Sequence, residues 1–182
     1  VLVIGAGGGV GIHMVQMARL CGGRVLAADI GDDKLALAKT WGADEVIDAR
    51  RGDVAQQVKG LTDGRGADAV IDVVGIRQTL EAGIQALAIG GKMVIIGAKP
   101  QSVYGEDPSF MLDPGYFMHR GLELHSSRYV TAAEIALTLE LVRDKRIEPV
   151  VTRTFALEQV EEAHELIRNN ATAGRIALVL GD

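Results

Sequence analysis

The sequence predicts an α/β fold with a doubly wound parallel sheet, and three observations support this prediction. Short apolar stretches alternate with stretches that carry apolar residues at helical spacing, a pattern typical of strands joined by crossover helices. Five glycines follow the first apolar stretch, and Asp29 closes the second. Together these features predict six strands in the order 3-2-1-4-5-6 at residues 1–146, followed by a short C-terminal appendage at residues 147–182.

The glycine run lies between a predicted strand and a predicted helix. Backbone N–H groups at such a turn and the positive end of the helix dipole both favour a phosphate. A strict G-x-G-x-x-G that starts at Gly5 fails at Val10, but registers starting at Gly5 or Ala6 both contain Gly8 and Gly11. In both registers Gly8 lies where a diphosphate would approach, and Gly11 lies where the helix packs on the strand. Taken alone, the run is also compatible with a structural turn that binds nothing.

The acid after the second strand strengthens the dinucleotide interpretation. Asp29 lies eighteen residues after Gly11, close to the spacing at which a carboxylate accepts hydrogen bonds from the adenosine ribose. A carboxylate at this position repels a 2′-phosphate, and Ile30 provides no arginine to bind one. We therefore expect NAD rather than NADP. The alternative is that Asp29 is an ordinary solvated residue at the end of a strand.

The remaining elements follow in order. We expect a helical turn inside a loop at residues 98–120, and a helix that starts at the capping box of Thr131 and Glu134. Gly90 and Gly91 are expected to close the helix that precedes the fifth strand. The predicted strands are 1–4, 24–29, 45–48, 67–72, 92–97 and 122–126, with extended segments at 147–155 and 176–180; the predicted helices are 12–20, 31–40, 53–61, 77–88, 131–143 and 157–169.

The predicted strand order places a crevice between strands 1 and 4, at their carboxyl ends. Strand 4 leads into Val74 and Gly75, and strand 5 leads into the turn of Gly97, Ala98 and Lys99. We expect these turns to lie beside the nicotinamide half of the dinucleotide. Each glycine is equally compatible with a simple end to its strand.

Composition excludes several classes of function. The net charge of −5 and the 4% of aromatic residues argue against a nucleic-acid partner, and no apolar run approaches the length of a membrane span. The only cysteine, Cys21, allows no intrachain disulfide, which fits a cytoplasmic protein. The histidines lack the spacing of metal ligands, so we expect no metal site and no catalytic residue in this chain, although His13 could approach a phosphate. The histidines are His13, His119, His125 and His164.

Several short motifs together resemble one family. They are Gly8-Gly-Val-Gly11, Val15-Gln-Met-Ala18, Asp29 followed by Lys34, Leu37-Ala-Lys39 before Gly42-Ala-Asp44, Asp72-Val-Val-Gly75, Gly90-Gly-Lys92, and Gly174-Arg175. This combination resembles the cofactor-binding Rossmann domain and C-terminal segment of the medium-chain, zinc-type alcohol dehydrogenases and their quinone-reductase relatives. The resemblance implies an oxidoreductase that transfers a hydride between nicotinamide and a small alcohol or carbonyl compound.

The resemblance also implies roles for individual residues. Asp29 would hold the adenosine ribose with help from Lys34, the turn of Gly8, Gly9 and Val10 would lie under the diphosphate, and Arg175 would reach a cofactor phosphate. From the residues alone, Lys34 is a solvated helix residue and Arg175 a cation at a strand edge. The family further implies a homodimer or tetramer that pairs through the edge of the sixth strand.

The family's zinc ligands lie in an N-terminal catalytic domain that has no counterpart in this sequence. The chain starts without methionine inside a predicted strand, so we expect a downstream part of a longer protein, with residues 147–182 returning to the absent domain. We expect such a chain to bind NAD(H) without turnover, as the cofactor half of an alcohol dehydrogenase. The alternatives are a zinc-free NADPH-dependent quinone or enoyl reductase and a non-catalytic nucleotide-sensing module. A methyl-donor-dependent transferase is a further alternative, but it fits the motifs poorly.

Overall fold

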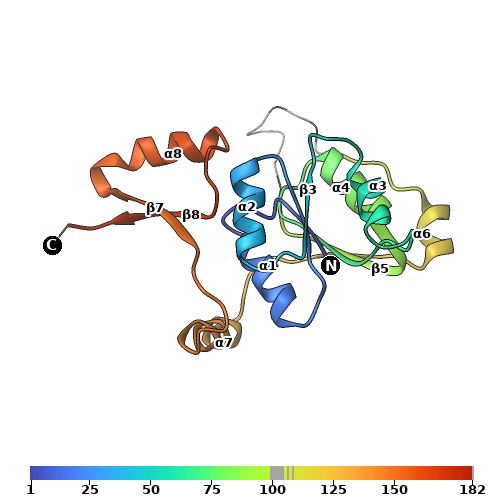
Figure 1. Cartoon of the computed structure of the whole chain (residues 1–182), viewed down its shortest axis with the longest axis horizontal. Helices are drawn as coiled ribbons and strands as arrows, with labels where there is room; N and C mark the ends of the chain where they lie inside the picture. Colours follow the sequence, from blue (N-terminus) through green and yellow to red (C-terminus); the bar gives the residue numbers. More distant parts are fainter. Residues whose placement is uncertain (99–104, 106, 108, 182) are drawn as a thin grey trace.

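A single parallel sheet forms the main body of the protein. The computed structural model describes residues 1–98, 105, 107 and 109–181. Its six strands have the order β3-β2-β1-β4-β5-β6 and are parallel throughout, which confirms the predicted fold class (Figure 1). The strands are β1 (Leu2–Ile4), β2 (Leu26–Asp29), β3 (Glu45–Asp48), β4 (Ala67–Asp72), β5 (Leu87–Ile95) and β6 (Glu123–Ser126).

Helices cover both faces of this sheet, because side chains along a strand point alternately to opposite faces. Val3 of β1 packs in one buried cluster with residues of α1 and α2, whereas Leu2 and Ile4 pack in another with residues of α3 and α4. The central strands of the sheet are therefore buried on both sides, as is usual in parallel sheets. The helices are α1 (Gly11–Leu20), α2 (Asp32–Thr40), α3 (Val54–Gly60) and α4 (Arg77–Ala86).

The boundary between α4 and β5 was predicted wrongly. The helix ends at Ala86 and the strand begins directly at Leu87. Gly90 and Gly91 lie inside β5, where the pairing with β4 shifts register. Because Gly90 has a left-handed φ of +72°, the two glycines form an irregularity within the strand instead of closing the helix.

The segment between β5 and β6 is described in part. Residues 99–104, 106 and 108 lie outside the described residues, so the expectation for Lys99 is not addressed by the structure. The predicted helical turn is present as α6 (Pro114–Arg120). Asp113 caps it, because its carboxylate accepts hydrogen bonds from the backbone N–H groups of Gly115 (2.8 Å) and Tyr116 (3.2 Å).

The chain leaves the sheet after β6. This strand is the outer edge of the sheet next to β5, and all four of its residues are exposed. The helix α7 (Ala132–Arg143) begins at the predicted capping box of Thr131 and Glu134. It lies apart from the strands at the bottom of Figure 1, and none of its residues is buried, although several are large and apolar.

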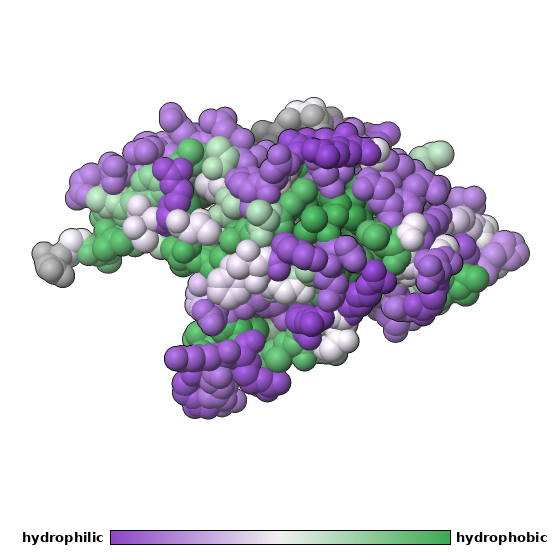
Figure 2. All heavy atoms as spheres, in the orientation of Figure 1, coloured by the Kyte–Doolittle hydropathy of each residue, from purple (hydrophilic) through white to green (hydrophobic). Residues whose placement is uncertain are grey.

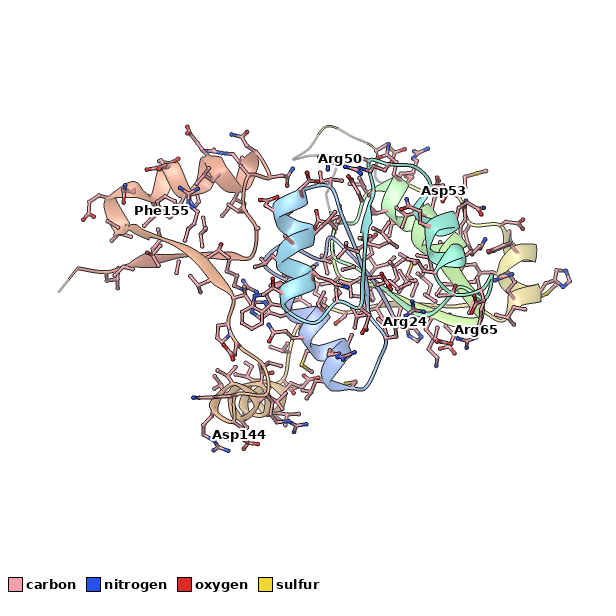
Figure 3. All side chains as sticks on the ribbon, viewed as in Figure 1. Arg24, Arg50, Asp53, Arg65, Asp144 and Phe155 are labelled. Carbon is pink, nitrogen blue, oxygen red and sulfur yellow. The ribbon has the colours of Figure 1, made fainter. Side chains whose placement is uncertain are left out.

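The C-terminal segment forms a small unit of its own. Its elements are β7 (Val151–Ala156), the short 3₁₀ helix η1 (Leu157–Gln159), α8 (Val160–Arg168) and β8 (Arg175–Val179). β7 and β8 pair in parallel as a separate two-stranded sheet, and the buried Phe155 lies between this sheet and α8 (Figures 1 and 3). Of the apolar face predicted for α8, Ala163 is buried but Ile167 is 52% exposed. Figure 2 shows apolar atoms gathered on this unit and beside α7.

Candidate functional site

The glycine turn brings the end of β1 to the start of α1. The backbone N–H groups of Gly5 and Ala6 both donate to the carbonyl oxygen of Ala28 on β2, at 2.9 and 3.2 Å. The helix then begins at Gly11, one residue earlier than predicted. A Cβ atom on Gly11 would lie 2.0 Å from the carbonyl oxygen of Gly5, so only glycine allows this close approach of helix and strand.

Gly7 is a member of the turn to which the sequence analysis assigned no role. Its N–H donates to the Oδ2 atom of Asp29 at 2.8 Å, and its carbonyl oxygen accepts from the N–H of Gly174 at 2.7 Å. A Cβ atom on Gly7 would lie 2.4 Å from the Cβ atom of Lys34. Gly7 therefore joins the turn to β2, to α2 and to the C-terminal segment, and its place in an uninterrupted glycine triplet is the signal that was available in the sequence.

Asp29 closes β2 at the carboxyl edge of the sheet and is 8% exposed. Each carboxylate oxygen accepts one backbone hydrogen bond at 2.8 Å, Oδ2 from Gly7 and Oδ1 from Ile30. The Nζ atom of Lys34 lies 4.0 Å from Oδ1, and its side chain is largely buried, so this lysine is not a solvated helix residue. Because a carboxylate oxygen can accept two hydrogen bonds, both oxygens retain capacity for a ligand's hydroxyl groups.

Seven of the twelve predicted site residues line one cavity of about 380 Å³, whereas Gly11 and four others do not. Gly5, Gly8, Gly9 and Val10 line it from the glycine turn. The predicted residues Asp29, Lys34 and Val74 line it from β2, α2 and the turn after β4. Residues that the sequence analysis did not select also contribute to the lining, namely Ile4, Ala28, Ile30, Ala49, Val73, Ile76, Thr79 and Asn170.

Two of these additional residues carry polar side chains. Thr79 accepts a hydrogen bond from the N–H of Ile76 (3.2 Å) and donates to its carbonyl oxygen (3.0 Å), so it fixes the start of α4. Asn170 has a left-handed φ of 52° in the loop after α8. Asparagine directly after a helix is a known signal for that conformation, but no local pattern shows that this loop reaches the glycine turn.

The turns after β4 and β5 meet each other beside this cavity. A Cβ atom on Gly75 would lie 2.1 Å from the carbonyl oxygen of Gly97, so the two backbones pass without room for a side chain. Asp72 is fully buried, and its Oδ1 atom accepts hydrogen bonds from the N–H groups of Val74 (2.7 Å) and Gly75 (3.1 Å). Close packing of two strand ends therefore explains both glycines, and neither Gly75, Gly97 nor Ala98 lines the cavity itself.

The C-terminal segment reaches back to the glycine turn, as the position of Arg175 implied. Gly174 forms an isolated parallel bridge with Gly8. A Cβ atom on Gly9 would lie 3.1 Å from the Cγ atom of Arg175, so this side chain runs along the turn. Arg175 is thus adjacent to the predicted diphosphate position without lining the cavity.

His13 does not direct a nitrogen toward a phosphate. Its Nδ1 atom lies 2.9 Å from the carbonyl oxygen of Gly9, and its Nε2 atom lies 3.2 Å from the backbone nitrogen of Val150. Burial lowers the pKa of His13, and the positive charge of Arg175 lowers it further, while the hydrogen bond to Gly9 acts in the opposite direction. The other histidines and Cys21 lie elsewhere, and the described residues hold no group of three or more potential metal ligands.

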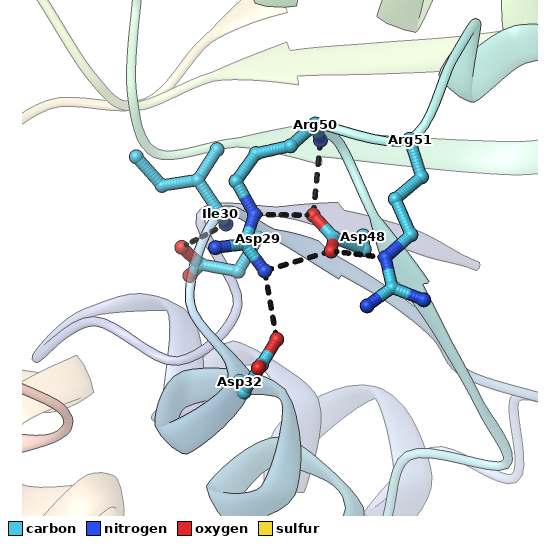
Figure 4. A network of polar contacts seen from close by, with 6 residues as sticks. All are labelled: Asp29, Ile30, Asp32, Asp48, Arg50 and Arg51. Atoms are coloured by element: carbon cyan, nitrogen blue, oxygen red, sulfur yellow. Dashed lines mark hydrogen bonds and ion pairs between the residues drawn. The ribbon is translucent and has the colours of Figure 1, made fainter.

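A group of ion pairs lies next to Asp29 at the ends of β2 and β3 (Figure 4). The guanidinium of Arg50 contacts the carboxylates of Asp48 (2.8 Å) and Asp32 (2.7 Å), and Arg51 contacts Asp48 at 3.0 Å. Hydrogen bonds from Arg50 hold the pKa of Asp48 well below its usual range and raise the pKa of Arg50 above its own. These cations are therefore already engaged by carboxylates.

Within the described residues, no helix combines the length and the apolar character that crossing a membrane requires.

Comparison with known proteins relates this site to one family. The family described as zinc-binding dehydrogenase matches residues 9–144. A protein named NAD-dependent alcohol dehydrogenase from Sulfurisphaera tokodaii is 32% identical over 179 residues, which cover 98% of this chain and 50% of that protein. A protein named acryloyl-coenzyme A reductase from the same organism is 28% identical over 177 residues, with 97% of this chain and 49% of that protein covered.

Solved structures agree with these relatives. A crystal structure of an NAD-dependent alcohol dehydrogenase matches with a TM-score of 0.86 and 33% sequence identity. The matched region covers 99% of this chain and 50% of the chain in that structure. The chain therefore spans about half the length of the relatives it matches. The glycine turn, the strand order and the family match together show that the chain belongs to the zinc-binding dehydrogenases, the medium-chain oxidoreductases that its motifs resemble.

Proposed function

We propose that this chain is the NAD(H)-binding half of an alcohol dehydrogenase-like oxidoreductase. The observation that carries the proposal is the cavity that the glycine turn and the carboxylate of Asp29 line together. A bound nicotinamide would accept or donate a hydride, and the substrate would be a small alcohol or carbonyl compound. In this proposal, this half of the protein binds and orients the cofactor.

The residues present fit a dinucleotide. Asp29 can accept hydrogen bonds from two ribose hydroxyls, because each of its oxygens uses only one acceptor position within the chain. The N-terminus of α1 provides backbone N–H groups for the diphosphate, and Gly8 and Gly9 carry no side chain that would block its approach. Lys34 and Arg175 lie beside this path with their positive charges.

The charges around Asp29 favour NAD over NADP. The buried carboxylate would repel a 2′-phosphate, and Ile30 follows it where NADP-binding sites often have an arginine. The nearby guanidinium of Arg50 is held by Asp48 and Asp32 and is not available to a phosphate without breaking these pairs (Figure 4).

We propose that residues 147–182 complete a catalytic domain contributed from outside this chain. A two-stranded sheet such as β7 and β8 is too small to be stable alone, and Val151, Leu178 and Val179 remain exposed on it. A zinc ion would then be bound in that other domain. The exposed edge of β6 supports a homodimer or tetramer formed by strand pairing, which sedimentation analysis of the chain at increasing concentration would test.

Separate titrations of the purified chain with NAD⁺ and NADP⁺ test the proposal. We expect NAD⁺ to bind at least about tenfold more tightly, which corresponds to about 1.4 kcal/mol. We also expect no oxidation of alcohols by the chain alone. Failure of both nucleotides to bind would contradict the proposal, as would measurable turnover without the rest of the protein.

The acryloyl-coenzyme A reductase relative supports a second candidate. In this alternative the whole protein is a zinc-free reductase of enoyl compounds or quinones, of the kind that usually uses NADPH. Tighter binding of NADP⁺ than of NAD⁺ would favour this alternative, and substituting Asp29 would then improve NADP⁺ binding very little.

A further inference from the structure

His13 connects two segments that are far apart in the sequence. Both of its ring nitrogens are used: Val150 N–H donates to Nε2 at 3.2 Å, so the hydrogen resides on Nδ1 and is donated to the carbonyl oxygen of Gly9 at 2.9 Å. One helical turn later, the amide of Gln16 exchanges two hydrogen bonds with the backbone of Glu148, at 3.0 and 2.8 Å. The same face of α1 thus holds the chain just before β7.

These contacts continue to Arg175. The N–H of Arg175 donates to the carbonyl oxygen of Val150 at 2.8 Å, so Val150 is bonded on one side to His13 and on the other to β8. Val150 is itself buried in the cluster beneath α1. A displacement of the His13 ring would therefore move the Gly9 carbonyl and the backbone that carries Arg175 at the same time.

We infer that His13 is a positioning residue that sets the diphosphate-binding turn and Arg175 relative to each other through its two hydrogen bonds. The inference rests on the proposed function, because the turn and Arg175 are the parts of the site assigned to the cofactor phosphates. Neither the family match nor the motifs of the sequence assign such a role to this histidine. His13 acts through Gly9 and Val150 and does not touch the cofactor itself.

The arrangement requires a neutral imidazole. A second proton would sit on Nε2 and face the N–H of Val150, which leaves two donors opposed. Arg175 on β8 is the charged side chain that acts on His13 from across the turn, and it opposes protonation. Gln16 on the same helix is neutral, and Glu148 contacts α1 through its backbone. Acidification should therefore open the contact and weaken the binding of NAD⁺.

A direct role for His13 at the phosphate predicts the opposite sign. A protonated imidazole that contacted a phosphate would strengthen its binding as the pH falls. The direction of the pH dependence consequently separates a positioning role from an electrostatic one. NAD⁺ is the suitable probe, because the 2′-phosphate of NADP⁺ would itself titrate near pH 6, like other phosphate monoesters.

The experiment measures the Kd of NAD⁺ calorimetrically between about pH 8 and pH 5, because the pKa of His13 is lowered and the titration must extend well below the ordinary pKa of histidine, about 6.5. The variants are His13→Asn, whose amide can replace Nδ1 toward Gly9, and His13→Gln, whose amide oxygen can replace Nε2 toward Val150. His125→Gln is the control, because His125 is exposed on β6 and pairs with Glu123. As the pH falls across this interval, we expect the affinity for NAD⁺ to decrease about fivefold in the unsubstituted chain and in the His125→Gln control. This decrease corresponds to the loss of about one hydrogen bond.

We expect both His13 variants to bind about fivefold more weakly at pH 8 and to lose the pH dependence. Equal affinities of variants and original at pH 8, a pH dependence that the variants retain, or tighter binding in acid would each overturn the inference. Failure of the original chain to bind NAD⁺ at pH 8 would instead contradict the proposed function. Nitrogen NMR of the imidazole then still tests the geometry, because a proton on Nε2 at pH 8 would overturn the inference without any ligand.

Discussion

Replacing Asp29 with asparagine tests the centre of the site, because it changes charge and hydrogen bonding with almost no change in volume. Both carboxylate oxygens accept backbone hydrogen bonds, from Gly7 and Ile30. An asparagine offers one oxygen and one NH₂ group, so one of these backbone donors must face another donor. An unsatisfied buried donor costs about 1–3 kcal/mol, and Lys34 also loses its partner. We expect the free energy of unfolding to fall by about 2 kcal/mol and the Tm by about 4–8 °C.

The same substitution should weaken NAD⁺ binding more than this loss of stability explains. Hydrogen bonds to a charged group contribute about 1.5–3 kcal/mol each, so we expect at least about a tenfold increase in Kd under conditions where the variant remains folded. Urea unfolding and calorimetric titration provide the two measurements. Asp63→Asn is the control, because Asp63 is exposed in the turn before β4. Unchanged stability together with unchanged Kd in the Asp29 variant would refute the role of this carboxylate.

Three further predictions concern the contacts around the glycine turn. Gly11→Ala should cost at least about 3 kcal/mol of stability in urea unfolding, because its Cβ atom would overlap a backbone oxygen at 2.0 Å, whereas Gly60→Ala, with open space around it, should be neutral or stabilising. The pKa of His13 is lowered in the folded chain, so the stability that the neutral imidazole contributes is fully present above about pH 6.5 and is lost as the pH falls. Between about pH 7.5 and pH 5 the Tm of the unchanged chain should therefore decrease more than the Tm of His13→Asn, and an identical decrease would contradict this assignment. Gln16→Ala removes two hydrogen bonds to the backbone of Glu148, so the free energy of unfolding should fall by about 1–3 kcal/mol. Hydrogen exchange of the backbone amides just before β7 should become faster. Unchanged exchange would show that these bonds do not hold this segment in place.

Local patterns were sufficient to predict most of the sheet domain. The apolar strands and the glycine turn specify where β1, β2 and β4 end, and these ends define the crevice. The boundary between α4 and β5 was missed because Gly90 and Gly91 suit a helix end as well as an irregular strand, and only the pairing with β4 decides between them. Likewise, nothing near Asn170 in the sequence indicates that its loop reaches the glycine turn.

The roles of single residues depended most on long-range contacts. Lys34 had the pattern of a solvated helix residue, yet its side chain is largely buried beside Asp29. Gly7 had no assigned role because its partners, Asp29 and Gly174, belong to distant segments. Burial and pairing of this kind arise only when the two ends of the chain come together, so spacing within a short motif cannot reveal them.

The bond between Gly7 and Gly174 has a consequence for protein engineering. One way to exchange cofactor preference between two dehydrogenases is a chimaera in which only the contiguous doubly wound sheet is transplanted. Here such a graft would join a foreign glycine turn to the recipient's own last strand, and the backbone bond at 2.7 Å would have to form between unrelated surfaces. A graft that also carries residues 147–181 keeps both sides of this junction from the same parent.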